Sequence, residues 1–148
     1  LLPGRGRVGG VQPVFFLDAS GSISDSVVAE MLTALRVTPI FADAMTFVFD
    51  TTTRGPFLAS DEQGILRAFR QGGGGTRIAR AWTDAADHVD PMCTRVWITD
   101  GLDAKGKLPD PWADDIWVGV GWHPEPVLMS RADLERRVGT WREEYEHV

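Results

Sequence analysis

The chain has 148 residues, 43% of them hydrophobic, and a formal net charge of -6 at pH 7. This size and apolar content suit one domain with its own core, and the acidic balance argues against a nucleic-acid partner, because such proteins usually present a basic face. No apolar run approaches the roughly 20 residues that a membrane span requires, and the one cysteine, Cys93, excludes an internal disulfide and fits a reducing compartment. We therefore expect a soluble, cytoplasmic protein that binds neither nucleic acid nor a membrane.

The chain divides into a short leading segment and one domain. Residues 1–10 have the glycine- and arginine-rich composition of a flexible N-terminal linker, and residues 11–148 are predicted to form the domain. Apolar runs of strand length alternate along it with apolar residues at helical spacing. In chain order we predict a strand at 11–18, a helix at 24–38, strands at 46–50 and 55–59, helices at 60–70 and from 78, strands at 94–100 and 115–121, and a last helix capped by Ser130.

Strands that alternate with helices, and that are apolar on both faces, are typical of a parallel sheet covered by helices on each side. We therefore predict an α/β fold of the Rossmann-like, three-layer sandwich type, with a mostly parallel central sheet. The segment 55–59 contains Pro56, which an edge strand tolerates, so we predict that it forms one antiparallel edge strand. Ser60 and Gln63 have the spacing of a capping box at the start of the helix at 60–70.

Three polar motifs lie at the ends of predicted elements. Asp18-Ala-Ser-Gly-Ser22 follows the apolar run 14–17, Gly72-Gly-Gly-Gly-Thr76 precedes a helix, and Asp100 ends a strand. Because functional groups gather beyond the carboxyl ends of parallel strands, we expect these motifs to share one edge of the sheet. One carboxylate and two hydroxyls on a strand-to-helix turn suit a small, hard cation, so the sequence predicts a site for Mg²⁺ or Mn²⁺.

Each motif by itself has an ordinary alternative. The segment Asp18 to Ser22 can be a helix N-cap cluster, the glycine run can be a linker, and Asp100 can be a turn residue. Their occurrence together, in this order and on one predicted edge, favours the metal site. Asp50 ends the strand at 46–50 on the same edge, either as a support to the site or as an exposed residue.

In residue type, order and context, Asp18-Ala-Ser-Gly-Ser22, Gly-Gly-Gly-Thr76 and Trp97-Ile-Thr-Asp-Gly101 resemble the metal-ion-dependent adhesion site (MIDAS) of von Willebrand factor type A (VWA) domains. The resemblance covers about residues 11 to 122 and is stronger to a bacterial and phage group found C-terminal to predicted metallopeptidase-like regions. It implies that Ser20 and Ser22 are direct hydroxyl ligands and that Thr76 binds directly or through water. It also implies that Asp18 and Asp100 mostly hold coordinated waters.

The resemblance implies a non-catalytic adaptor, whose Mg²⁺ keeps one position open for a Glu or Asp carboxylate of a partner protein. Intracellular bacterial relatives often work beside AAA+ ATPases of the MoxR kind, so an ATPase or its client is the expected partner. Arg77 stands where the family commonly has an acid, which leaves the partner's identity open.

The alternative is an enzyme, a Mg²⁺-dependent, aspartate-based phosphotransferase or phosphatase of Rossmann-like fold. Such enzymes usually carry a second Asp two residues after the first. Ser20 occupies that position here, and no suitable lysine lies between Asp18 and Asp100. We therefore expect no catalysis.

Overall fold

The computed structural model describes residues 13–21, 23–36, 43–101, 115–121, 126–130, 132–133 and 136. The predicted linker at 1–10 and most of the predicted last helix lie outside the described residues. The elements are, in chain order, β1 (Val14–Asp18), α1 (Asp25–Arg36), β2 (Met45–Phe49), β3 (Thr53–Leu58), α2 (Glu62–Gln71), α3 (Ile78–Ala85), the 3-10 helix η2 (Ala86–His88), β4 (Arg95–Thr99), β5 (Ile116–Gly119) and β6 (Val127–Met129). Within the described ranges, no helix has the length and apolarity needed to cross a bilayer.

The strands form a six-stranded mixed sheet in the order β3-β2-β1-β4-β5-β6. β1 pairs in parallel with β2 and β4, and β4 pairs in parallel with β5, so the centre of the sheet is parallel as predicted. β3 runs antiparallel to β2 and confirms the predicted edge strand, with Pro56 inside it. β6 pairs antiparallel with β5 at the opposite edge, and its three residues are too short a run for the sequence pattern to have predicted.

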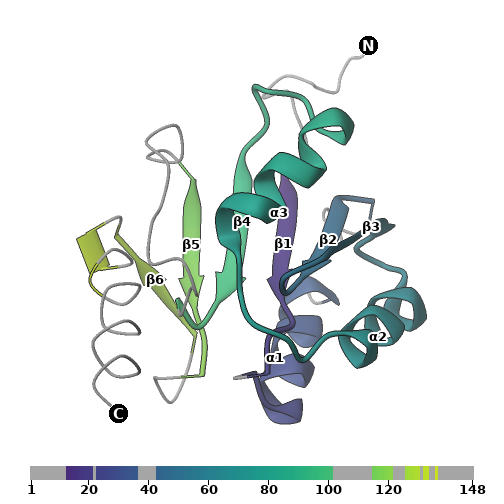
Figure 1. Ribbon diagram of the computed structural model, residues 1–148, viewed down its shortest axis with the longest axis vertical. Coiled ribbons are helices and arrows are strands. Elements are labelled where there is room, and N and C mark those ends of the chain that lie inside the picture. The colour runs from purple at the N-terminus through teal and green to yellow at the C-terminus, as the bar shows by residue number, and fades with distance from the viewer. Residues whose placement is uncertain are drawn as a thin grey trace.

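Helices cover both faces of this sheet, which gives the predicted three layers (Figure 1). One hydrophobic cluster joins the sheet to α1 and α2 and includes Leu17, Val48, Ile98, Met31, Leu32 and Ile65. A second cluster joins the opposite face to α3 and includes Phe16, Phe47, Trp97, Trp117, Ile78 and Ala81. Because strand residues alternate between these clusters, each central strand is apolar on both faces.

A row of stacked aromatic rings crosses four strands on the face covered by α3. Phe16 lies opposite Phe47 and Trp97, and Trp97 lies opposite Trp117. The ring centroids are 5.4 Å apart for Phe16 and Phe47, 4.0 Å for Phe16 and Trp97, and 5.2 Å for Trp97 and Trp117. Each such pair contributes about 0.5–1.5 kcal/mol beyond its burial, and a slip of one residue turns a ring to the other face. The row therefore fixes the register that sets the ends of β1 and β4 side by side.

The start of α2 differs from the prediction by one residue. The N-cap is Asp61, whose Oδ1 accepts a hydrogen bond from the backbone N–H of Gly64 at 3.0 Å. The predicted capping box of Ser60 and Gln63 is therefore wrong. A carboxylate at the N-cap satisfies the same free amide and also interacts favourably with the helix dipole.

Candidate metal centre

Asp18 is the last residue of β1, and its side chain is fully buried at the carboxyl edge of the sheet. Its Oδ1 accepts a hydrogen bond from the backbone N–H of Ser20 at 2.9 Å, and its Oδ2 accepts one from Thr99 Oγ1 at 2.6 Å. Thr99 ends the neighbouring strand β4, and its Oγ1 accepts a hydrogen bond from the N–H of Gly101 at 3.1 Å. Two strand ends thus hold the carboxylate in one orientation.

A second acid lies beside this carboxylate. Asp100 follows β4 and is 4% exposed. Burial, and then repulsion from Asp100, raise the pKa of Asp18 to about 7, although hydrogen bonds from Thr99 and Ser20 lower it. In the part of the chain that the structure describes, no Lys, Arg or His forms an ion pair with Asp18. Because a buried carboxylate is costly without a countercharge or a metal, this edge of the sheet favours a bound cation.

The glycine-rich connection between α2 and α3 is bound directly to the turn that follows β1. The N–H of Gly21 donates to the carbonyl of Gly74 at 2.9 Å, and the N–H of Gly73 donates to the carbonyl of Ala19 at 2.8 Å. A Cβ atom on Gly21 would lie only 2.8 Å from the carbonyl oxygen of Gly73, so the two backbones approach this closely only with glycine at that position. In Figure 1 the connection crosses the end of β1. The bond from the N–H of Arg77 to the carbonyl of Asp50 holds the preceding residue, the buried Thr76, near the ends of the strands.

Asp50, at the end of β2, braces the glycine loop from the other side. Its Oδ2 accepts a hydrogen bond from the N–H of Gly74 at 3.1 Å, and its Oδ1 accepts bonds from the N–H of Thr52 at 2.9 Å and from Arg54 at 3.0 Å. Arg54 also donates to the carbonyl of Gln71 at 3.0 Å. Burial raises the pKa of Asp50, but these hydrogen bonds outweigh it, and the net pKa is below the ordinary value. Asp50 is thus a buried support of the glycine loop, and the alternative that it is an exposed residue is wrong.

The structure places four of the predicted ligands at one edge of the sheet, all of them buried. Their exposed fractions are 0% for Asp18 and 4% each for Ser20, Thr76 and Asp100. Ser22 lies outside the described residues. The described residues contain no group of three or more His, Cys, Asp or Glu side chains that could hold a metal ion. The predicted ligand set contains only two carboxylates, and its other members are hydroxyl groups. These hard oxygen donors fit Mg²⁺ or Mn²⁺.

Two contacts at the candidate site were not predicted from the sequence. Thr99 belongs to the strand motif, but its bond to Asp18 requires the register between β1 and β4. Arg77 donates its backbone N–H to the carbonyl of Asp50 at 3.1 Å and so ties the start of α3 to the end of β2. The only local signal for the contact between Thr99 and Asp18 was that a small hydroxyl residue directly precedes Asp100 in the sequence.

Comparison with models of known protein families and with curated proteins gives no match. Membership in the VWA family therefore stays a prediction based on the three motifs. The α/β fold with a mostly parallel sheet is consistent with that prediction but does not show the family, because many unrelated families share such a fold.

Proposed function

We propose that this chain is a Mg²⁺-dependent protein-binding domain of the VWA type, which captures a Glu or Asp carboxylate of a partner. The ion would be held by Asp18, Ser20, Ser22, Thr76 and Asp100 at the carboxyl edge of the sheet. The observation that most supports this proposal is the buried Asp18 carboxylate, which is oriented by two neutral donors beside a second acid.

The chemistry of these residues suits capture of an anion. Hydroxyl ligands are neutral, so they leave much of the ion's double charge unquenched, and a coordination position occupied by water can be taken by a carboxylate. The N-terminus of α1 begins at Asp25, a few residues after Ser20, and the positive end of its helix dipole also favours an incoming anion. A Glu or Asp of another protein would complete the octahedral coordination.

The first partner to test is an AAA+ ATPase of the MoxR kind, or a client of one, because the resemblance to intracellular bacterial VWA domains points there. The net charge of -6 makes long-range attraction to an acidic partner weak. Recognition would therefore depend on the ion itself, and capture of the partner should disappear in EDTA and return with Mg²⁺.

Isothermal titration calorimetry with Mn²⁺ tests the site directly. Asp18→Asn and Thr76→Ala should each abolish binding, because each removes an oxygen ligand or its charge. Asp87→Asn and Thr83→Ala are matched controls on exposed positions of the same protein and should bind like the wild type. Unchanged Mn²⁺ binding in both site variants, with circular dichroism showing an intact fold, would refute the proposed function.

A further inference from the structure

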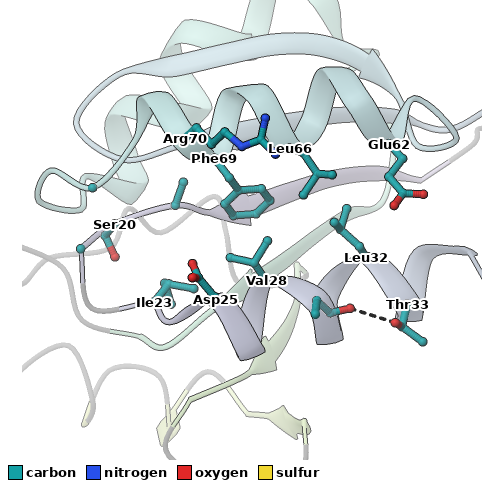
Figure 2. Close-up of a pocket in the computed structure, with 14 residues that line it drawn as sticks. Ser20, Ile23, Asp25, Val28, Leu32, Thr33, Glu62, Leu66, Phe69 and Arg70 are labelled. Atoms are coloured by element: carbon teal, nitrogen blue, oxygen red, sulfur yellow. Dashed lines mark hydrogen bonds between the residues drawn. The ribbon is translucent and has the colours of Figure 1, made fainter.

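A groove of about 610 Å³ runs between α1 and α2 and opens onto the candidate metal centre. Ser20, Gly21 and Gly73 line one of its ends, and these residues belong to the two loops that form the centre. Figure 2 shows Ser20 at that end and Glu62 at the other, with both helices between them. A ligand bound at the centre would therefore lie at the entrance of this groove.

The walls of the groove are apolar. Val28 and Leu32 of α1 face Leu66 and Phe69 of α2 across it (Figure 2). Val28, Leu66 and Phe69 are only partly buried, with one side of each packed against the core cluster and part of each exposed to solvent. A volume of this size lined mainly by apolar side chains, with a few polar groups at its ends, is typical of a binding site.

A carboxylate bound to an ion cannot by itself distinguish one partner from another, since every acidic side chain offers the same group. Specificity requires contacts that only the right partner makes, and buried apolar anchors usually supply them. The groove provides such contacts directly beside the position where the carboxylate would bind.

The charges at the two ends define the rest of the ligand. The half of the groove near the metal centre would attract an acid through the ion and also carries Asp25 and Arg70, whose charges oppose each other, whereas the far end carries the Glu62 carboxylate. A partner with a basic residue at that far end would match the charge of Glu62.

We propose that the groove between α1 and α2 binds a partner segment that carries an acidic residue, then bulky apolar residues, then a basic residue. The acid binds the ion, the apolar side chains fill the space between Val28 and Phe69, and the basic residue pairs with Glu62. This proposal rests on the proposed function, and it specifies which class of protein segment the site selects.

A random peptide library displayed on phage, selected on the full chain in Mg²⁺, provides the probe. The highest-affinity peptides are then synthesised with a fluorophore, and their affinities are measured by polarisation. Leu66→Lys places a charge in the groove and should weaken binding by about tenfold or more, whereas Leu128→Lys, at an exposed leucine of β6 outside the groove, should change nothing. Mn²⁺ calorimetry on Leu66→Lys should match the wild type, which shows that the fold and the centre are intact.

A charge exchange tests the far end of the groove. Glu62→Lys should weaken the selected peptides, and replacing their basic residue by Glu should restore binding to this variant only.

The outcomes separate the two proposals. Selected peptides that share an acid but no apolar pattern, and that bind Leu66→Lys as well as the wild type, overturn the groove proposal and leave the metal site standing. Apolar peptides that bind equally in EDTA also overturn it, because the groove would then act without the ion. Absence of Mn²⁺ binding by the wild type overturns the proposed function, and the groove proposal falls with it.

Discussion

Replacing Asp18 by Asn should stabilise the metal-free protein, and should do so more at pH 8 than at pH 5. The pKa of Asp18 is about 7 in the folded protein, against 3.8 for the ordinary group, so the folded state holds this proton more tightly than the unfolded state. The stability that this group contributes therefore falls as the pH rises from about 4 to 7, and the loss remains above pH 7. Asn has nearly the same shape, can accept the hydrogen bond from Ser20, and carries no charge to desolvate.

The size of the effect follows from the two pKa values. Their difference of about 3 corresponds to about 4 kcal/mol at high pH, since one pKa unit is worth 1.36 kcal/mol. About a third of this cost is already present at pH 5, so the stability gap between variant and wild type should widen by about 3 kcal/mol from pH 5 to pH 8. The hydrogen bond from Thr99 lowers the pKa of Asp18 and is therefore already included in this difference, so it needs no separate correction.

Urea unfolding in EDTA, followed by the fluorescence of the buried Trp97 and Trp117, measures this gap. Asp87→Asn, which removes an exposed carboxylate elsewhere on the protein, is the control. With Mg²⁺ at about a hundred times its dissociation constant, the wild type alone should gain about 2.7 kcal/mol. An equal gap at pH 5 and pH 8 would contradict the reasoning, because the Asp18 carboxylate would then not be destabilised by burial and Asp100.

Gly21→Ala should weaken Mn²⁺ binding in calorimetry and cost about 1–3 kcal/mol of stability in urea unfolding, because its Cβ would collide with the glycine loop. Gly75→Ala is the control, because its Cβ would meet only a methyl group at 3.6 Å, and it should change neither the Mn²⁺ affinity nor the stability. Asp50→Asn should cost about 1–3 kcal/mol in urea unfolding, because it breaks the mostly buried ion pair with Arg54 and weakens the contact with Gly74. Asp84→Asn breaks an exposed ion pair of the same spacing, with Arg80, and should cost under about 0.5 kcal/mol. Equal losses of stability in these two variants would show that Asp50 does not support the glycine loop. Generic phosphoesters should show no turnover above that of an Asp18→Asn control, and clear turnover would favour the phosphotransferase alternative.

The sequence predicted those parts of the fold that depend on local patterns. Apolar runs indicated every parallel strand, and the acids at the ends of β1 and β4 could be assigned to one edge because parallel strands end there. The cap of α2 was misassigned because Ser60 and Asp61 are equally good N-caps, and only the backbone geometry decides between them. The contact of Asp50 with Gly74 joins two segments that are far apart in the sequence, and its contact with Arg54 forms where the chain turns back from β2 into β3. No local pattern predicts either contact.

The contacts around the glycine loop also indicate how the site is assembled. The bonds from Gly21 to Gly74, from Gly73 to Ala19 and from Gly74 to Asp50 are all made between protein groups. Bonds between protein groups therefore link these loops, whereas in small metal-dependent folds the binding energy of the metal is spent on folding the chain. If the proposed ion binds here, little ordering is left to be done, and more of its interaction energy with a carboxylate would be available for binding a partner. A preorganised, oxygen-lined edge of this kind suits a reversible binding domain better than a structural metal site.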